Sequence, residues 1–488
     1  MTDYKAARIE KRDALRARGI DPYGRDWDPR RVTTPIDEVR AHLEKPDFAD
    51  EKFSFTIAGR IMAVRGHGKA SFFDLKDRTG RLQGYVRRDI GGDALMDLFG
   101  LFDLGDLIAV TGTLFRTRTG EPTLLVREVV VLAKAVLPMP EKWHGLQDVE
   151  IRYRQRYLDL IANDESRAIF IKRSRMVRTI RGYLDERGFM EVETPMMQTI
   201  PGGAAARPFK THHNALDMPL FLRIAPELFL KRLLVGGLER VYEINRNFRN
   251  EGISTRHNPE FTMLEVYQAC GDFNAMMDLC EGVITAAARE VCPAGTVQFG
   301  EHLVNLAGPW PRRAFGDLLR EHCGLADMRD DAALQACAAR EHIKTAGVPR
   351  AQLLDGLFSA GVEPTLVNPT FVTGYPVELC PLSKTTRDDP TLTDRFELFM
   401  GCFEVANAYT ELNDPEEQAR RFKEQAGAGA EGFDGVIDAD YVEALSYGMP
   451  PAGGLGIGID RLAMLLLGVT SIRDVILFPI LRSAAPEA

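Results

Sequence analysis

Residues 241–267 place the strongest local constraint on the fold of this chain. The segment reads VYEINRNFRNEGISTRHNPEFTMLEVY, with one strand-like run before Arg249 and a second run after Pro259. Side chains at alternate positions of a strand share one face. The second run places on one face Phe261, Met263, Glu265 and Tyr267. The segment therefore predicts a β-hairpin that presents an aromatic ring, a carboxylate and a phenol to one ligand.

The same hairpin carries cationic groups that suit phosphate. Arg249 ends the first run, and Arg256 and His257 lie in the glycine-containing loop that follows. Planar guanidinium groups match phosphate oxygens in pairs, so this arrangement favours a polyphosphate ligand. A solvated hairpin with scattered charges would contain the same residues, and chemistry alone leaves both interpretations open.

A second pattern fills residues 53–135, where short alternating runs are separated by glycine-containing turns. The runs are FTIAGRIMAVR, SFFDLKDRTG, RLQGYVRRD, DLIAVTGTLFRTRTG and PTLLVREVVVLAK. Short strands at regular spacing of about 8–12 residues are typical of a small β-barrel. The pattern matches a five-stranded barrel of the oligonucleotide-binding (OB) type.

The rest of the chain divides around this barrel. Residues 1–52 predict a helical segment whose first helix ends near Gly19, and residues 136–165 predict a proline-containing linker or hinge. Residues 166–488 mix long helical patterns with strands, without regular βαβ alternation. This predicts an antiparallel sheet flanked by helices, with a helix-rich part at 272–360 that offers no site residues. The predicted fold class is α+β.

Composition limits the setting in which the chain works. It contains no apolar run near the ~20 residues of a membrane helix, and its beginning lacks a signal-peptide core. The seven Cys form no CxxC pair, which predicts a reducing, cytoplasmic location and no structural zinc. Net charge is −9, yet residues 60–88 are basic and suit nucleic-acid phosphates. A solvated strand face would have the same local composition.

Three segments together resemble the motifs of class II aminoacyl-tRNA synthetases, in the form that lysyl-tRNA synthetases carry. Residues 188–209 resemble motif 1, the hairpin at 241–267 resembles motif 2, and residues 453–468 resemble motif 3. The resemblance extends over residues 1–482. It implies an anticodon-binding OB barrel, a catalytic domain at 166–488 and a homodimer built around motif 1.

The resemblance implies ATP-dependent activation of L-lysine and transfer of the lysyl group to the 3′ end of tRNA(Lys). Arg249 and Arg461 are the implied catalytic residues, with Arg249 between the α-phosphate and the substrate carboxylate. Phe261 and Arg461 would enclose the adenine. The implied ATP-binding residues are Arg249, Glu251, Arg256, His257, Phe261, Glu404 and Arg461. Motif 3 predicts a glycine-rich strand entering a helix at Asp460, with Gly468 as its C-cap.

The resemblance also implies an amino-acid site. Its residues are Gly203 and Glu227 for the α-amino group, Arg249 and Asn407 for the carboxylate, and Glu265, Tyr267 and Glu411 for the side chain. Carboxylate and phenol oxygens suit an ammonium group, which has only donors. An aspartyl- or asparaginyl-tRNA synthetase is the nearest alternative, and its pocket would need cationic or donor groups. A non-catalytic tRNA-binding paralogue is the other alternative, and it would require the loss of the arginines or glutamates.

Spacing within residues 395–414 predicts a metal site. If Met400-Gly401 forms a two-residue turn, Glu397 lies directly opposite Glu404 across the hairpin. Opposed carboxylates repel each other, and a Mg²⁺ ion that also binds ATP phosphates would relieve the repulsion. The family resemblance likewise implies Mg²⁺ at Glu397 and Glu404. An ion pair between Arg395 and Glu397 is the structural alternative.

In the barrel, the resemblance implies that Phe72, Gln83 and Glu128 read the central uridine of a lysine anticodon. An aromatic side chain can stack on an unpaired base, and an amide can address its Watson–Crick edge. The alternative is that Phe72 belongs to the barrel core. In the catalytic segment, Cys402, with Ala406 and Ala408, departs from the commonest bacterial pattern, in which glycines are usual.

Overall fold

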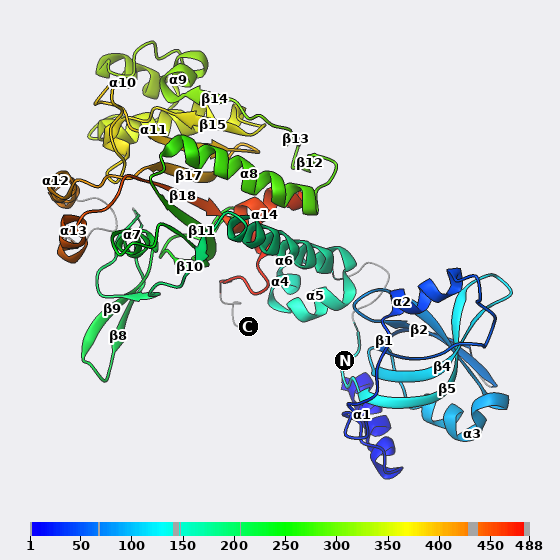
Figure 1. The fold of residues 1–488 in the computed structure, drawn as a ribbon. Coiled ribbons are helices and arrows are strands. Elements are labelled where there is room, and N and C mark those ends of the chain that lie inside the picture. The colour runs from blue at the N-terminus through cyan, green and yellow to red at the C-terminus, as the bar shows by residue number, and fades with distance from the viewer. Residues whose placement is uncertain are drawn as a thin grey trace. The chain divides into compact units, whose positions relative to one another are not determined.

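The computed structural model describes residues 2–66, 69–139, 146, 148–204, 206–427 and 438–482. The chain forms two compact units, Met1–Gly145 and Leu146–Ala488 (Figure 1). The division falls within the segment 136–165 that sequence analysis assigns to a linker. Part of that linker, residues 140–145 and 147, lies outside the described residues.

The first unit is built on a closed five-stranded barrel, as the alternating runs predict. The strands pair in the order β1-β2-β3-β5-β4, and β3 and β5 form the parallel pair. They are β1 (Ser54–Arg65), β2 (Ala70–Lys76), β3 (Arg81–Arg87), β4 (Leu107–Arg116) and β5 (Pro122–Ala133). The helices of this unit are α1 (Thr2–Ala17), α2 (Ile36–Ala41), η1 (His42–Glu44) and α3 (Arg88–Phe99).

Alternation along β2 separates two neighbouring aromatic rings. Phe73 is fully buried in the barrel core, whereas Phe72 is only half-buried on the other face of the strand. The ring of Phe73 packs on Gly84 of β3, where a Cβ atom would overlap it. A strand glycine at such a position permits this close approach. Phe72 is therefore not a core residue of the barrel.

The second unit is built on an eight-stranded sheet in the order β14-β15-β16-β17-β18-β11-β10-β6. The inner neighbours are antiparallel, as expected, while the outer pairs β14–β15 and β10–β6 are parallel. The strands are β6 (Met190–Glu191), β10 (Arg240–Phe248), β11 (Glu260–Ala269), β14 (Arg312–Ala314), β15 (Thr370–Thr373), β16 (Arg395–Phe399), β17 (Glu404–Thr410) and β18 (Ala452–Gly458).

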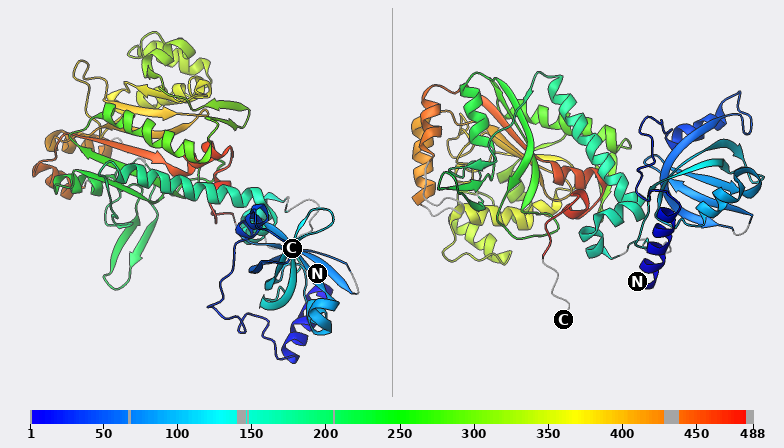
Figure 2. Two further views of the ribbon diagram at one scale, coloured as in Figure 1. Left: turned by 45° about the vertical axis from the view of Figure 1, so that its right-hand side comes forward. Right: turned by 90° about the horizontal axis from the view of Figure 1, so that it is seen from below.

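Long helices cover this sheet (Figure 2). Helix α8 (Phe273–Val291) packs on β17 and β18, and α6 (Asp164–Asp185) packs along α8. The Asp272 carboxylate caps α8 by accepting a hydrogen bond from the backbone N–H of Ala275 (2.9 Å). Apolar residues recur along α8 with helical spacing and are fully buried against the sheet, among them Met276, Cys280, Val283, Ile284 and Ala287.

The remaining elements surround this core. The helices are α4 (Val149–Arg154), α5 (Arg156–Ala162), α7 (Glu227–Val235), α9 (Phe315–Cys323), α10 (Asp331–Arg340), α11 (Arg350–Gly361), η2 (Glu363–Thr365), η3 (Val377–Leu379), α12 (Pro415–Gly427), α13 (Ala439–Ser446), α14 (Ile459–Leu467) and α15 (Ile472–Val475). Two small sheets are formed by β7 (Met197–Gln198), β8 (Lys210–His213) and β9 (Met218–Leu222), and by β12 (Thr296–Phe299) and β13 (His302–Asn305). Residues 272–360 are thus helix-rich, although they also contain β12, β13 and β14.

The two segments that resemble motifs 2 and 3 lie side by side at the sheet centre. β10 and β11 form the predicted antiparallel hairpin, and β18 pairs with β11 on one side and β17 on the other. β18 leads directly into α14, as the sequence predicts. Gly468 ends α14 with a left-handed conformation (φ 68°), which confirms the predicted C-cap.

The hairpin of β16 and β17 turns one residue later than predicted. Gly401 and Cys402 are its central residues, with φ values of 63° and 64°. The backbone N–H of Met400 donates to the carbonyl oxygen of Phe403 across the turn (3.1 Å). Tight hairpin turns of this kind need positive φ at both central positions, which the glycine supplies readily and the cysteine adopts less readily.

The later turn and a bulge in the hairpin change the strand register. Glu404 pairs with Phe399, and after the irregularity Glu397 pairs with Asn407. A bulge inserts one extra residue into one strand, so it shifts every pair beyond it. The predicted direct opposition of Glu397 and Glu404 is therefore wrong.

Two further features concern the chain as a whole. Within the described residues, no helix is both long enough and apolar enough to cross a membrane. All seven cysteines are free thiols, and four of them are buried. A buried free cysteine behaves as a small apolar side chain.

We expect Gly112→Ala to destabilise the barrel by about 1–3 kcal/mol, as overpacking does. A Cβ atom on this β4 residue would overlap the backbone carbonyl oxygen of Leu125. Gly100→Ala is the matched control in the same unit, because Gly100 has an ordinary φ of −62° and its Cβ would lie 3.6 Å from the nearest atom. Urea unfolding of both variants measures the difference, and equal stabilities would contradict the expectation.

Candidate active site

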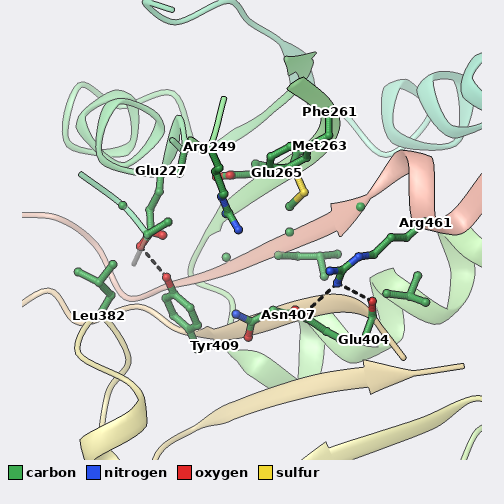
Figure 3. Close-up of a pocket in the computed structure, with 18 of the residues that line it drawn as sticks. Glu227, Arg249, Phe261, Met263, Glu265, Leu382, Glu404, Asn407, Tyr409 and Arg461 are labelled. Atoms are coloured by element: carbon green, nitrogen blue, oxygen red, sulfur yellow. Dashed lines mark hydrogen bonds and ion pairs between the residues drawn. The ribbon is translucent and has the colours of Figure 1, made fainter. Parts of the chain in front are cut away.

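A cavity of about 530 Å³ lies at the centre of the second unit (Figure 3). β11, β17, β18, the loop after β10 and the first turns of α7 and α14 contribute its walls. Every residue that sequence analysis assigns to ATP or lysine lines it: Gly203, Glu227, Arg249, Glu251, Arg256, His257, Phe261, Glu265, Tyr267, Glu404, Asn407, Glu411 and Arg461. One end of the cavity is rich in arginine and the other in glutamate.

Arg249 lies between the two ends. Its guanidinium group lies 5.1 Å from the centre of the Phe261 ring, a cation–π distance. Its enclosed Nε atom has no hydrogen-bond partner among the described residues. Burial lowers the pKa of this guanidinium, although arginine remains charged at any ordinary pH. An enclosed cation with an unused donor is ready to bind an anion.

Arg461 connects the motif 3 helix to the motif 2 loop. Its guanidinium donates to the Glu404 carboxylate (3.2 Å) and to the Glu404 carbonyl oxygen (3.0 Å). The same guanidinium lies 3.0 Å from Nε2 of His257. Phe261 and Arg461 thus line one cavity, and Arg461 is held by partners from β17 and from the loop.

His257 is arranged to accept rather than donate at Nε2. Burial, and then the nearby charge of Arg461, lower the pKa of His257, so the neutral ring is favoured. Because arginine can only donate, Nε2 accepts, and Nδ1 carries the proton toward the hydroxyl of Ser254 (2.9 Å). The tautomer is therefore fixed by its two neighbours.

Arg256 reaches across to the β16–β17 turn. It donates to the carbonyl oxygen of Cys402 (3.3 Å), and its guanidinium lies 5.3 Å from the centre of the Phe403 ring. Burial raises the pKa of the Cys402 thiol, so the protonated, unreactive form is favoured. The cysteine therefore contributes its backbone and its left-handed turn to the site.

Asp460 fixes the start of α14, and sequence analysis did not assign it a role in the site. Its buried carboxylate accepts from the backbone N–H of Thr262 on β11 (2.7 Å) and from Arg173 on α6 (2.6 Å). An acidic residue in the first turn of a helix was the available signal. These contacts tie β11 to the helix that carries Arg461.

The acidic end contains three buried carboxylates, from Glu227, Glu265 and Glu411. The hydroxyl of Tyr267 donates to Glu265 (3.1 Å), and the hydroxyl of Tyr409 donates to Glu227 (2.6 Å; Figure 3). Alternation places Glu265 and Tyr267 on one face of β11, whereas Tyr409 comes from β17 and Glu227 from the first turn of α7. Gly203 lines the same end of the cavity, beside Glu227.

Lys231 is the ammonium group of this end, and sequence analysis missed it. It is fully buried, and its Nζ contacts Glu227 Oε1 (2.5 Å) and Glu411 Oε2. Lys231 follows Glu227 by four residues on α7, a spacing at which helical side chains meet. That spacing could have suggested the ion pair with Glu227, but it gave no indication of the contact with Glu411.

Burial perturbs the carboxyl groups of this end strongly. It raises the pKa of Glu265 to about 8, and the charge of Glu227 adds to the effect. Burial likewise raises the pKa of Glu411, although the ammonium of Lys231 opposes the rise. Both carboxyl groups are therefore costly to ionise until further positive charge arrives.

The glycines of β18 make room for this cluster. A Cβ atom on Gly454 would overlap Oε1 of Glu411 and would lie 2.6 Å from the Tyr267 ring. A Cβ on Gly456 would lie 3.3 Å from the terminal methyl group of Met263. The glycine-rich sequence of motif 3 is thus required by side chains on both neighbouring strands.

Asn407 is held by a chain of contacts from β16. Nε of Arg395 donates to Oδ1 of Asn407 (3.0 Å), which leaves the amide donors of Asn407 for the cavity. Arg395 also pairs with Glu397, and the hydroxyl of Tyr375 donates to the second oxygen of that carboxylate (2.9 Å). The Arg395–Glu397 ion pair that sequence analysis named as the structural alternative is therefore present.

The barrel places two of the three expected anticodon residues in one groove. Phe72 and Gln83 line a cavity of about 870 Å³ together with Arg40, Arg65 and Arg118. The ring of Phe72 stacks on Tyr85 at 4.1 Å between centres. Glu128, the third residue, pairs instead with Arg31 (2.7 Å).

Comparisons with known proteins match both units. A family described as "tRNA synthetases class II (D, K and N)" matches residues 148–482, which is more than half of the chain. A family described as "OB-fold nucleic acid binding domain" matches residues 55–132.

Curated relatives match over the full length. The lysine–tRNA ligase of Syntrophomonas wolfei is 51% identical over 100% of this chain and 99% of its own. Those of Moorella thermoacetica and Carboxydothermus hydrogenoformans are 50% and 52% identical, each over 98% of its own length and 98–99% of this chain. Two family models match successive parts of the chain, and about half of its residues are identical to those of these ligases over nearly the full length. The chain therefore belongs to the lysine–tRNA ligase family of class II synthetases.

Proposed function

We propose that this chain activates L-lysine with ATP and transfers the lysyl group to the 3′ end of tRNA(Lys). Family membership supports the reaction class, and the acidic end of the cavity supports the amino acid. The observation that carries the choice of lysine is the surplus of buried carboxylates over buried ammonium groups.

The charges at the acidic end favour a ligand that carries two positive charges. Glu227, Glu265 and Glu411 would carry three negative charges when ionised, and Lys231 compensates one of them. Two uncompensated charges in a buried site are costly. L-Lysine brings two ammonium groups, which form strong charge-assisted hydrogen bonds with carboxylates. Substrate and pocket would therefore neutralise each other.

The substrate groups are assigned accordingly. The α-amino group is placed at Gly203 and Glu227, and the side-chain ammonium at Glu265, Tyr267 and Glu411. The amide of Asn407, oriented by Arg395, and the guanidinium of Arg249 face the carboxylate. All of these groups line the cavity, and so does Arg395.

The alternatives fit the cavity less well. An aspartate side chain would meet like charge at Glu265 and Glu411, and asparagine would leave them without a cation. A non-catalytic paralogue is opposed by the presence in one cavity of Arg249, Arg461 and the glutamates. Among these alternatives, lysine is the amino acid whose charges match those of the pocket.

The arginine-rich end would bind ATP. We assign the α-phosphate to Arg249, the outer phosphates to Arg256 and His257, the adenine amino edge to Glu251, and the two faces of the base to Phe261 and Arg461. The lysine carboxylate would form a bond to the α-phosphorus as the bond to pyrophosphate breaks. No covalent bond to the enzyme is required, so the protein acts by positioning and by charge stabilisation.

Mg²⁺ fits this end as a companion of ATP. The Glu404 carboxylate lines the cavity. Burial raises the pKa of Glu397 to about 7, the charge of Arg395 opposes this rise, and the charge of Glu404 adds to it. Among the described residues, no cluster of three or more His, Cys, Asp or Glu forms a ready metal site. This suits an ion bound largely by phosphates and water. When bound, it would neutralise phosphate charge, with Glu404 and Glu397 as its protein carboxylates.

The first unit is assigned to the anticodon, with Phe72, Gln83 and Glu128 as the residues that read its central uridine. We assign residues 1–52 to a helical extension of this unit and residues 166–488 to the catalytic domain. The half-buried ring of Phe72 supports the assignment, because it lies in a groove lined by four arginines, Arg40, Arg65, Arg81 and Arg118. Bases stack on such rings, and phosphates pair with arginine.

We further propose a homodimer in the cytoplasm. Met190 and Met197, in the segment that resembles motif 1, are 53% and 59% exposed, which favours a partner surface there. Seven free thiols favour a reducing compartment.

The proposed function predicts selective ATP–pyrophosphate exchange. We expect lysine to support exchange at least about 10³-fold more efficiently than any other standard amino acid, because neutral and acidic side chains leave buried carboxylates unpaired and the planar guanidinium of arginine differs in shape from an ammonium. Exchange measured with each of the twenty amino acids, without tRNA, provides the test. A preference for aspartate or asparagine would overturn the proposal.

Arg249→Ala should reduce lysine-dependent exchange by about 10²–10³-fold, the usual cost of one preorganised donor to a developing charge. Arg246→Ala is the matched control on the same hairpin, since Arg246 pairs with Glu260 at 3.6 Å. Both variants should keep the unfolding transition of the wild type. Exchange in Arg249→Ala that equals that of the control would remove Arg249 from the mechanism.

Phe72→Ala should raise the KM for tRNA by about tenfold or more, the cost of losing one stacked base. Pyrophosphate exchange without tRNA should stay at the wild-type level, because the substitution lies in the other unit. Phe73→Ala, next to it but in the core, should instead unfold the barrel. If Phe72→Ala also impaired exchange, or left aminoacylation intact, the anticodon assignment would be wrong.

A further inference from the structure

Lys231 contacts two walls of the amino-acid end but lies behind them. Its partners Glu227 and Glu411 both line the cavity, but Lys231 itself does not. Its Nζ also lies 5.4 Å from the centre of the Tyr409 ring. Lys231 therefore approaches the carboxylates from the side away from the substrate.

This approach leaves one oxygen of Glu411 for a ligand. Lys231 forms an ion pair with Oε2, although neither oxygen of Glu411 has a hydrogen-bond partner among the described residues. Oε1 is buried and lies over Gly454 in the cavity wall. An unpartnered carboxylate oxygen at this place is a ready acceptor for an ammonium group. The same contact fixes the rotation of the carboxylate, because one oxygen is held from behind.

The other groups packed around this pair supply no second cation. Tyr441 from α13, Tyr409 from β17, and Glu265 and Tyr267 from β11 all interact with Glu411 or with its neighbour Glu227. Each of these is acidic or neutral.

Two arginines near this end of the cavity pair with other carboxylates. Arg232 pairs with Asp438 and Asp440, and Arg223 forms a buried pair with Glu243 (2.7 Å). In the part of the chain that the structure describes, Lys231 is thus the cation in contact with Glu411.

We propose that Lys231 is a positioning residue for amino-acid selection, which holds the carboxylates of Glu227 and Glu411 from behind, lowers the cost of ionising Glu411 and directs Oε1 of Glu411 toward the side-chain ammonium of lysine. This inference rests on the proposed function and adds a residue to it. Burial raises the pKa of Glu411 to about 8 even though Lys231 opposes the rise, so the loss of Lys231 would raise this pKa further and favour the neutral form more strongly. A protonated Glu411 can donate, and so would no longer select an ammonium group.

Lys231→Met tests this, since methionine keeps most of the length and apolar volume of the side chain but removes its charge. We expect the KM for lysine in tRNA-free exchange to rise about tenfold or more at pH 7, while the KM for ATP changes less than about twofold. The ratio of the lysine KM values, variant to wild type, should fall as pH rises from 7 to 9. Higher pH restores the ionised form of Glu411 despite its further raised pKa.

Lys134→Met is the matched control. Lys134 is also a buried lysine between two carboxylates, Asp103 (2.5 Å) and Asp106 (2.8 Å), but it lies in the barrel unit. Its substitution should lower stability and leave the KM for lysine unchanged. Lys231→Arg, which retains the charge, should bring the KM for lysine back toward the wild-type value.

The outcomes separate the inference from the proposed function. If wild-type protein shows no lysine-dependent exchange, the proposed function fails. If it does, an unchanged KM for lysine in Lys231→Met, or an equal and pH-independent rise for lysine and ATP, overturns the role of Lys231. Should Lys231→Met not fold, Lys231→Gln carries the same expectations, because its amide can still donate to Glu227 without bringing charge.

Discussion

The arrangement of the catalytic unit depends on buried carboxylates that outnumber the positive groups beside them. Glu227, Glu265 and Glu411 come from three parts of the chain that meet at one cavity, where these side chains are buried and ionisation is costly. Hydrogen bonds from the phenols of Tyr267 and Tyr409 and the charge of the Lys231 ammonium lower the cost of burying the carboxylates. They do not neutralise all of the negative charge. The carboxylates that remain without a counter-charge give the folded protein a site that attracts cations before any ligand binds.

Much of this could be predicted from the sequence, because simple periodicity governs it. Alternation along residues 261–267 identified the face of β11 that lines the cavity, and glycine-containing turns identified the barrel strands. The glycines of residues 453–458 predicted a strand that enters a helix. The resemblance to lysyl-tRNA synthetases then supplied roles that periodicity cannot give, and all thirteen residues assigned to ATP and lysine line one cavity.

The remaining features depend on details that a pattern does not contain. The register of β16 and β17 depends on a non-glycine residue, Cys402, in a left-handed conformation and on a bulge, so the count from Met400-Gly401 failed. In the sequence, Lys231 looks like an ordinary lysine on a largely apolar helix. Its contact with Glu411, 180 residues further along the chain, is formed only by the fold. Arg395 can reach Asn407 because the shifted register places their strands in that alignment.

β18 has a consequence for how the site moves. Its glycines at 454 and 456 leave it without side chains to pack on the cavity side, so its position there depends on backbone hydrogen bonds to β11 and β17. A strand held in this way cannot loosen on its own, since any displacement breaks both ladders at the middle of the sheet. The cavity wall therefore opens and closes only with the core of the unit. Its amide protons should be among the slowest in the protein to exchange with solvent, although they lie beside a cavity.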